Sequence, residues 1–239
     1  MKFSKMFFHQ FYYPPAGAYS YILADRACGA AVIVDPVLED CERYLAFLER
    51  LELDLQLSID THLHADHVTG GGALAAATDC GLAMSEYSKA APIDVRLRHE
   101  QTLLVGSHTI TVLHTPGHTL DSLCLVAEDR VLTGDTLLIG ATGRTDLTGG
   151  DACAQYRALT QMLMTLPADF LVYPGHDYRG AAVSTIGHER AYNPRLQIGL
   201  VSDYAAMMEK LRLPLPQQIQ VAVPANLVMG TNQSKAALE

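Results

Sequence analysis

Residues 61–67 read THLHADH and hold three histidines and one aspartate within six positions. All four side chains carry lone pairs that bind cations such as zinc and iron. Without a cation, a buried cluster of this kind would leave polar groups competing for too few hydrogen-bond partners. The glycines at 70–72 follow at once, which favours a turn over a helix face. The stretch therefore predicts a metal site.

Three more candidate ligands follow apolar stretches further along the chain. Each stretch has the pattern of a strand and ends just before the ligand. The pairs are residues 108–114 with His118, residues 130–134 with Asp135, and residues 169–174 with His176. Residues 55–60 lead into the cluster at 61–67 in the same way. Because ligands in α/β proteins gather where strands end, we expect these four ends to meet at one edge.

The remaining segments alternate between strands and helices. Rich in β-branched and aromatic residues, the segments 19–25 and 29–36 are expected to be strands. Helices are predicted at 37–53, 68–81, 149–167 and on both sides of Asn193 and Pro194, whereas the Pro-rich stretch 213–230 has no strong periodicity. This rhythm indicates an α/β (α+β) fold with two sheets covered by helices on both outer faces. We expect one domain over residues 1–239, with the segment from about 180 packed on it.

The composition fits a globular chain and excludes several partners. Hydrophobic residues make up 49% of the 239 positions, which is enough for a substantial core. Seventeen Lys and Arg stand against 26 Asp and Glu, with no basic cluster, so we expect no nucleic-acid partner. No apolar run reaches the roughly 20 residues of a membrane span, and no targeting segment is recognisable. We expect a cytoplasmic protein of bacterial type that binds no membrane.

The five cysteines are odd in number and lie far apart, without a C-x-x-C pair. This pattern indicates reduced, mostly buried thiols rather than a disulfide framework or a zinc ribbon. They are Cys28, Cys41, Cys80, Cys124 and Cys153.

Four motifs, THLHADH, HTPGHT, TGDT and YPGHDY, resemble in order and separation those of the metallo-β-lactamase fold superfamily, over nearly the whole chain. The resemblance implies an αββα sandwich in which two β-sheets lie between outer helices and metal binds at one edge. Its ligand positions map onto His62, His64, Asp66, His67, His118, Asp135 and His176. The superfamily includes dizinc hydrolases, lactonases, oxidoreductases and nucleases, so the fold alone does not choose the reaction.

Two coordination schemes fit these seven residues. In the first, Asp135 bridges two metal ions, and a bridging hydroxide hydrolyses an ester or thioester. One ion then binds His62, His64 and His118, and the other binds Asp66, His67 and His176. In the second scheme, a single iron binds His62, His118 and Asp135, and the other four residues support these ligands. The ligands themselves do not decide between the two.

Three stretches outside the ligand motifs resemble the persulfide dioxygenase (ETHE1-like sulfur dioxygenase) family and favour the second scheme. They are GATGRTDLTGGDACAQYRAL (140–159), DYRGAAVSTIGHERAYNPRL (177–196) and LPLPQQIQVAVPAN (213–226). The resemblance implies oxidation of glutathione persulfide, with dioxygen and water, to sulfite and glutathione. It implies one Fe(II) per chain, bound by His62, His118 and Asp135. The residues that support these ligands would be His64, Asp66, His67, His176 and Asp177.

Glutathione needs cationic and hydrogen-bonding contacts for its carboxylates, and three residues are candidates. They are Arg144 in GRTD, Tyr178 in HDY and Arg195 in NPRL. Each has a second interpretation that the sequence leaves open. Arg144 could be a solvated surface charge, Tyr178 a packing aromatic, and Arg195 the partner of an acid in the C-terminal segment.

The alternative function is a dizinc glyoxalase II-like hydroxyacylglutathione hydrolase (thioesterase) or a lactonase. Glyoxalase II enzymes usually have H-E-Y where this chain has HDY, and a longer helical C-terminal segment. A non-catalytic metal- or sulfur-binding protein is a third hypothesis, which the complete ligand set disfavours. The resemblance also allows a homodimer, and a separate rhodanese or sulfide:quinone oxidoreductase in the same pathway.

Overall fold

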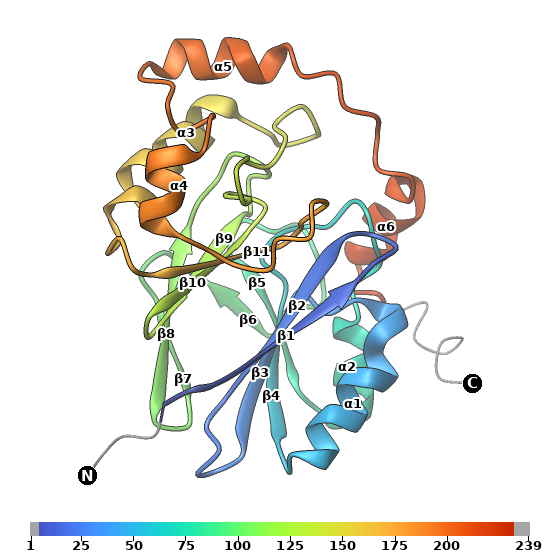
Figure 1. Ribbon diagram of the computed structural model, residues 1–239. Helices are drawn as coiled ribbons and strands as arrows, with labels where there is room; N and C mark the ends of the chain where they lie inside the picture. Colours follow the sequence, from blue (N-terminus) through green and yellow to red (C-terminus); the bar gives the residue numbers. More distant parts are fainter. Residues whose placement is uncertain (1–4, 232–239) are drawn as a thin grey trace.

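The computed structural model describes residues 5–231 and contains two six-stranded mixed sheets packed face to face (Figure 1). In the first sheet the strands follow the order of the chain: β1 (Phe7–Tyr13), β2 (Ala18–Ala24), β3 (Ala30–Val34), β4 (Asp54–Ile59), β5 (Gly81–Ser85) and β6 (Val95–Leu97). In the second sheet the order is β12 (Ser184–Thr185), β11 (Leu171–Pro174), β10 (Arg130–Gly134), β9 (Leu123–Ala127), β8 (His108–His114) and β7 (Thr102–Val105).

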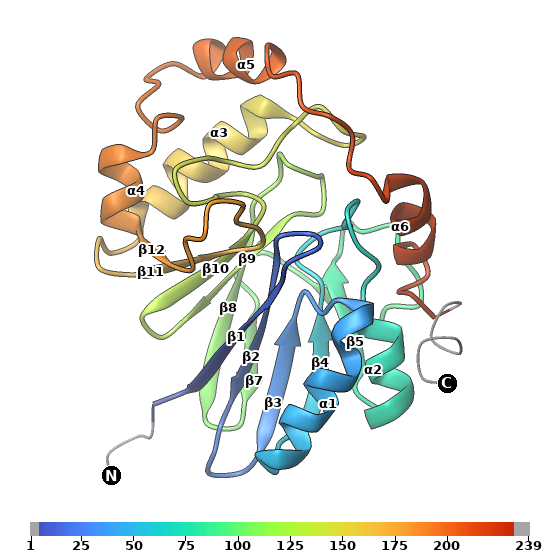
Figure 2. The same cartoon turned by 45° about the vertical axis from the view of Figure 1, so that its right-hand side comes forward.

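Helices cover the outer faces of both sheets, as the turned view in Figure 2 shows. On the first sheet lie the short 3-10 helix η1 (Leu38–Asp40), α1 (Cys41–Arg50) and α2 (Gly71–Thr78). On the second lie α3 (Ala152–Gln161), η2 (Leu163–Thr165), α4 (Ile186–Tyr192) and α5 (Val201–Glu209). The last helix, α6 (Ile219–Asn226), lies near α2 (Figure 1). This arrangement confirms the predicted αββα sandwich.

The main hydrophobic core lies between the two sheets. Inward-facing residues such as Leu23 and Val32 of the first sheet meet Ile110 and Leu125 of the second. All seven residues of β2 are buried, because its other face packs against α1 through Ile22 and its neighbours. Burial of this kind stabilises by roughly 1.5–3 kcal/mol for each large aliphatic side chain. The sandwich therefore gives the loops at its edge a rigid support.

The strand directions bring the predicted ligands to one edge. β8 and β10 both pair antiparallel with β9, and β10 pairs parallel with β11. The carboxyl ends of β8, β10 and β11 therefore point the same way. The amide of Leu123 donates a hydrogen bond of 2.8 Å to the carbonyl of Thr61, which joins the end of β4 to the second sheet.

Several predicted boundaries were wrong. The predicted helix at 68–81 is only α2, because Asp79 adopts a left-handed φ of 60° and β5 begins at Gly81. The stretch 82–105, to which no element was assigned, contains the rest of β5 and the strands β6 and β7. The stretch 213–230 contains α6 despite Pro224 inside it. Eight residues with an internal proline have little intrinsic helical stability, so packing against the rest of the protein determines this helix.

Two expectations from composition can be compared with the structure. All five cysteines are free, and Cys41, Cys80 and Cys124 are buried, which confirms mostly buried thiols. Within residues 5–231, none of the helices has both the length and the apolar character that a membrane span requires.

Candidate metal centre

The four strand ends converge, and three of the predicted ligands form one compact group. His62 follows β4, His118 follows β8, and Asp135 follows β10. One ligand atom from each lies within 4.8 Å of the others, and His118 Nε2 is 3.7 Å from Asp135 Oδ2. Two donors at about 2.1 Å from one ion lie roughly 3 to 4 Å apart. The group therefore has nearly the dimensions of a single metal site.

Thr61 orients His62. Its amide and hydroxyl donate to the two carboxylate oxygens of Asp35, at 2.6 and 2.8 Å. Since the hydroxyl has one proton and gives it to Asp35, its oxygen must accept the 2.9 Å hydrogen bond from His62 Nδ1. Nδ1 of His62 then carries the proton, and Nε2 has a free lone pair. Burial lowers the pKa of His62 well below its usual value, which keeps the ring neutral and able to bind a metal.

His118 is fixed in the same tautomer by a backbone carbonyl. Its Nδ1 lies 2.8 Å from the carbonyl oxygen of Arg144, an atom that can only accept, so Nδ1 carries the proton. Nε2 faces Asp135. Gly143 makes this close approach of the loop geometrically feasible, because a Cβ there would lie 3.0 Å from the His118 ring and 2.0 Å from the Asp135 carbonyl. In both histidines Nδ1 is thus bound by the chain, and Nε2 is the nitrogen left for a metal.

Asp135 is held by His176, which lies between two carboxylates. Nδ1 of His176 is 2.7 Å from Asp135 Oδ1, and Nε2 is 2.9 Å from Asp66 Oδ2. Burial alone would lower the pKa of His176, but Asp135 and Asp66 raise it well above its usual value. Burial would likewise raise the pKa of Asp135, but His176, His118 and His62 bring it below its usual value. His176 thus supports Asp135 through Nδ1, and its Nε2 contacts Asp66.

His64 and His67 differ from each other. Burial lowers the pKa of His64, but Asp35, 3.2 Å from its Nε2, outweighs this effect and raises it to about 9. His67 Nδ1 meets Asp66 Oδ2 at 2.8 Å, whereas its buried Nε2 has no hydrogen-bond partner among residues 5–231. Nδ1 of His64 is also buried and has no hydrogen-bond partner in the part of the chain that the structure describes. His64, Asp66 and His67 form a second compact group, which could bind a second metal ion.

Asp177 does not contact these ligands through its carboxylate. Its Oδ2 accepts hydrogen bonds from the amides of Arg179 and Ala181, at 2.9 and 2.7 Å. Its own amide donates to the carbonyl of Gly17 at 3.0 Å. Asp177 therefore shapes the loop that follows His176.

Arg144 is occupied by contacts within the chain. Its guanidinium binds both carboxylate oxygens of Asp146, at 2.6 and 2.7 Å, and the carbonyls of Pro214 and Leu213, at 2.6 and 3.2 Å. The side chain is only 13% exposed, so it is not a solvated surface charge. Four of its five N–H groups have partners. The arginine ties the loop after Asp135 to the segment between α5 and α6.

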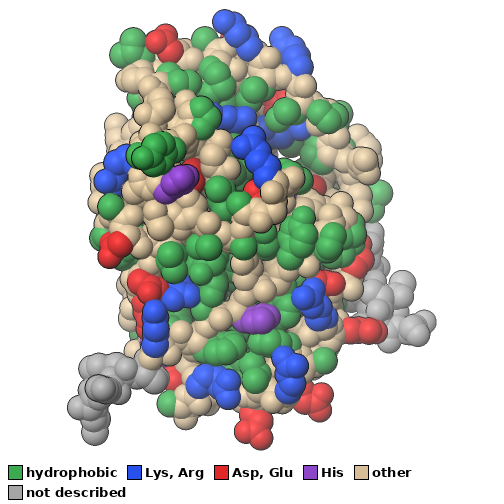
Figure 3. Space-filling model, viewed as in Figure 1, with side chains coloured by type: hydrophobic (Ala, Val, Ile, Leu, Met, Phe, Trp, Pro, Cys, Tyr) green, Lys and Arg blue, Asp and Glu red, His purple; other side chains and the backbone are tan. Residues whose placement is uncertain are grey.

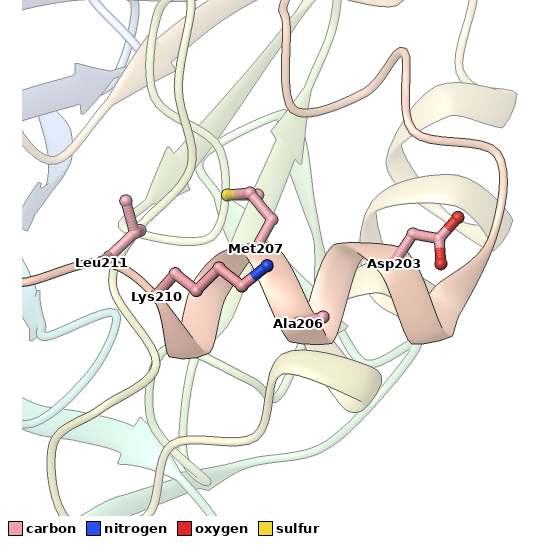
Figure 4. A pocket seen from close by; sticks show the side chains of 5 residues that line it. All are labelled: Asp203, Ala206, Met207, Lys210 and Leu211. Carbon is pink, nitrogen blue, oxygen red and sulfur yellow. The ribbon is translucent and has the colours of Figure 1, made fainter.

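Arg195 and Tyr178 are more open. Nη1 of Arg195 donates to the carbonyl and hydroxyl oxygens of Thr142, at 2.6 and 3.1 Å, and no acid within residues 5–231 forms an ion pair with it. Tyr178 is 73% exposed, and its ring stacks on His176 with centroids 6.0 Å apart. Figure 3, which has the same view as Figure 1, shows Lys and Arg side chains around a hollow in the upper half of the face that it presents. The recess on α5 in Figure 4 contains none of the predicted site residues.

Sequence reasoning missed two residues of this site and underestimated a third. Asp35 was not singled out, although it follows the apolar strand β3 just as Asp135 follows β10. Thr61 was interpreted only as a turn residue, but it orients His62. Asn226, in the stretch without periodicity, donates to the carbonyls of His64 and His67. Asp35 had a detectable signal, whereas no sequence pattern indicated Asn226.

Comparisons with known proteins give consistent matches. The family described as "Metallo-beta-lactamase superfamily" matches residues 13–176. "Persulfide dioxygenase ETHE1, mitochondrial" from Bos taurus is 39% identical over 224 residues, which cover 92% of this chain and 87% of that protein. The Homo sapiens protein of the same name is 38% identical over 230 residues, covering 95% and 90%. The crystal structure of ETHE1 from Myxococcus xanthus superposes with a TM-score of 0.92 at 43% identity and covers 94% of this chain and all of that one.

Proposed function

The chain belongs to the metallo-β-lactamase superfamily and, within it, to the persulfide dioxygenase family, and we propose that it oxidises glutathione persulfide with dioxygen and water to sulfite and glutathione. The metal is one Fe(II) per chain, bound by His62, His118 and Asp135. One observation carries the assignment: His62, His118 and Asp135 each place one ligand atom within 4.8 Å of the others, and Nδ1 of both histidines is already bound by the chain.

The donor set fits ferrous iron. Two histidines and one carboxylate on one face are typical of non-haem iron oxygenases. When bound, iron supplies a redox-active centre with open positions at which a soft sulfur anion and dioxygen can meet. The buried partners Thr61, His176 and the Arg144 carbonyl keep the three ligands in place. Such partners typically account for 10–100-fold in metal affinity or activity.

The tripeptide part of the substrate would lie on the exposed side of this centre. Tyr178 covers His176 and offers a hydroxyl at the rim of the site. Nη1 of Arg195 binds Thr142, and within residues 5–231 no hydrogen bond engages its Nε or Nη2, so both can bind a carboxylate. Arg144 binds the same tripeptide through its remaining N–H, or after the 213–214 carbonyls move away. These three contacts are part of the proposal.

A direct test combines metal analysis with oxygen uptake. Protein purified without added metal is analysed for iron and zinc, then supplied with glutathione persulfide while oxygen and sulfite are followed. The expected outcome is about one iron per chain and sulfite formation that consumes oxygen. Oxygen uptake that does not depend on iron content would overturn the proposal.

The dizinc hydrolase remains the second candidate, because one specific feature favours it. His67 Nε2 is buried without a hydrogen-bond partner among residues 5–231 and lies in the second compact group, so a second ion would give it a partner. Two fully occupied zinc ions per chain, with hydrolysis of a glutathione thioester and no oxygen uptake, would establish this alternative. Anomalous scattering separates one ion from two directly.

The remaining assignments concern the cellular location, the oligomeric state and the pathway partners. We propose a cytoplasmic location, although the bovine and human relatives are named as mitochondrial proteins. A homodimer and a separate rhodanese or sulfide:quinone oxidoreductase as pathway partners also belong to the proposal. Size-exclusion chromatography with light scattering tests the first of these, and persulfide transfer from a purified rhodanese tests the second.

A further inference from the structure

Helix α6 contacts the loop that carries the cluster at 61–67, although some 160 residues separate them in the chain. The segment 227–230 continues this contact along the start of α2. The amide of Gly72 donates a hydrogen bond of 2.8 Å to the carbonyl of Met229, and the amide of Ala91 donates one of 2.9 Å to the carbonyl of Leu227. Met229 is fully buried. The end of the described chain is thus part of the structure around the ligand loop.

Asn226 makes the most specific of these contacts. Its Oδ1 accepts from the amide of Thr69 at 2.8 Å, and its Nδ2 donates to the carbonyls of His64 and His67, at 3.0 and 2.9 Å. The side chain is 2% exposed, so water cannot replace these bonds. Both protons and the oxygen of the side-chain amide therefore form hydrogen bonds. A buried amide that satisfies three backbone groups of one turn fixes the shape of that turn.

The glycines after the cluster permit this close approach. A Cβ at position 72 would lie 2.5 Å from the carbonyl oxygen of Met229, which no side chain could tolerate. A Cβ at position 71 would lie 3.3 Å from Met229 Cε. The glycine run in HVTGGG thus accommodates the C-terminal segment, and the sequence and the packing agree on the docking of α6.

We propose that Asn226 is a positioning residue of the metal centre, and that docking of α6 and binding of the metal are coupled. Asn226 fixes the carbonyls on both sides of Asp66, and Asp66 in turn holds His176 and, through it, Asp135. Coupling of this kind is reciprocal, so bound metal must stabilise the docked helix by the same factor. The inference rests on the proposed metal ligands but not on the reaction that they catalyse.

The first experiment exchanges the amide for a carboxylate of the same shape. In Asn226→Asp the two donors are lost, and an acceptor oxygen faces the two carbonyls. Gln220→Glu makes the same chemical change at an exposed position of α6 and serves as the matched control. Co(II) reports binding through its visible absorption without the persulfide reaction. We expect Asn226→Asp to bind Co(II) about 10–100-fold more weakly and with a changed spectrum, and Gln220→Glu to match the wild type.

A folded Asn226→Asp protein with the wild-type Co(II) affinity and spectrum would overturn the inference. Failure of the wild type to bind Co(II) through His62, His118 and Asp135 would instead count against the proposed function. Since Asn226→Asp could fail to fold, hydrogen exchange on the wild type provides a second measurement. Co(II) should slow exchange in residues 219–230 by about tenfold or more relative to α5, which does not contact the ligand loop. Equal exchange in α6 with and without Co(II) would also overturn the coupling.

Discussion

The metal ligands and the predicted substrate-binding residues differ in what their polar atoms already do. At the metal centre, His62 and His118 each have one ring nitrogen bound by the chain, which leaves the other for a metal. On the substrate side, Arg144 has most of its donors bound to Asp146 and to carbonyls some 70 residues away. The metal centre therefore has atoms available to bind an ion, whereas most donors of Arg144 already bind other residues of the chain. Residue type alone therefore does not predict a role, because the hydrogen-bond partners decide which polar atoms remain for a ligand.

The largest expected effect tests which histidines are ligands. His118→Ala should abolish iron retention, because it removes one of three donor atoms. His67→Ala should cost about 10–100-fold in affinity or activity, because that ring only supports the ligands. Iron per chain after dialysis against a chelator measures both, with the exposed His188→Ala as the control. Equal and complete loss of iron in both variants would show that His67 is itself a ligand.

The next effect tests whether buried partners preset the metal centre. In the wild type, both carboxylate oxygens of Asp35 accept hydrogen bonds from Thr61, and Oδ1 also contacts His64. Asp35→Asn replaces one of these two oxygens by an amide NH2 group, which cannot accept. The Thr61 hydroxyl can then turn its proton towards His62, and the wrong tautomer follows. We expect iron affinity to fall by roughly tenfold or more, as for other partners of metal ligands. The control is Asp54→Asn, an exposed carboxylate of β4. Wild-type affinity in Asp35→Asn would mean that the strand ends alone orient His62.

These two regions also show how far sequence alone could go. The fold and the convergence of His62, His118 and Asp135 were predictable, because each of these residues follows the end of a different strand and strand ends share an edge. Asp35 could have been found by the same rule. The contacts of Arg144 with Leu213 and Pro214 and the docking of α6 were not predictable, since they depend on carbonyls and amides of distant segments that no side-chain pattern encodes. Asn226 is the clearest case, because all three of its partners are backbone atoms.

A third variant, Arg144→Ala, decides whether this arginine belongs to the substrate or to the chain. If it binds the glutathione part, KM for glutathione persulfide should rise about tenfold or more with iron intact, as the loss of a charged hydrogen bond costs roughly 1.5–3 kcal/mol. Oxygen-consumption kinetics on the iron-replete protein measure it. Limited proteolysis of residues 210–218 supplies the contrast: faster cleavage with an unchanged KM would assign Arg144 to anchoring Leu213 and Pro214 alone.

The smallest effect is expected for Arg195→Lys, which keeps the charge and changes only the geometry. The guanidinium of Arg195 binds Thr142 through Nη1 and can still offer Nε and Nη2 to a carboxylate as a planar pair. Lysine provides a point charge without that fork, so KM should rise a few-fold while kcat and iron content stay unchanged. Arg212→Lys, at an exposed arginine after α5, is the matched control. If Arg195→Lys lowered kcat or iron content instead, its bond to Thr142 would be what matters. The loop from β10 to Arg144 would then depend on Arg195 for its position, and the arginines of both segments would serve the chain rather than the substrate.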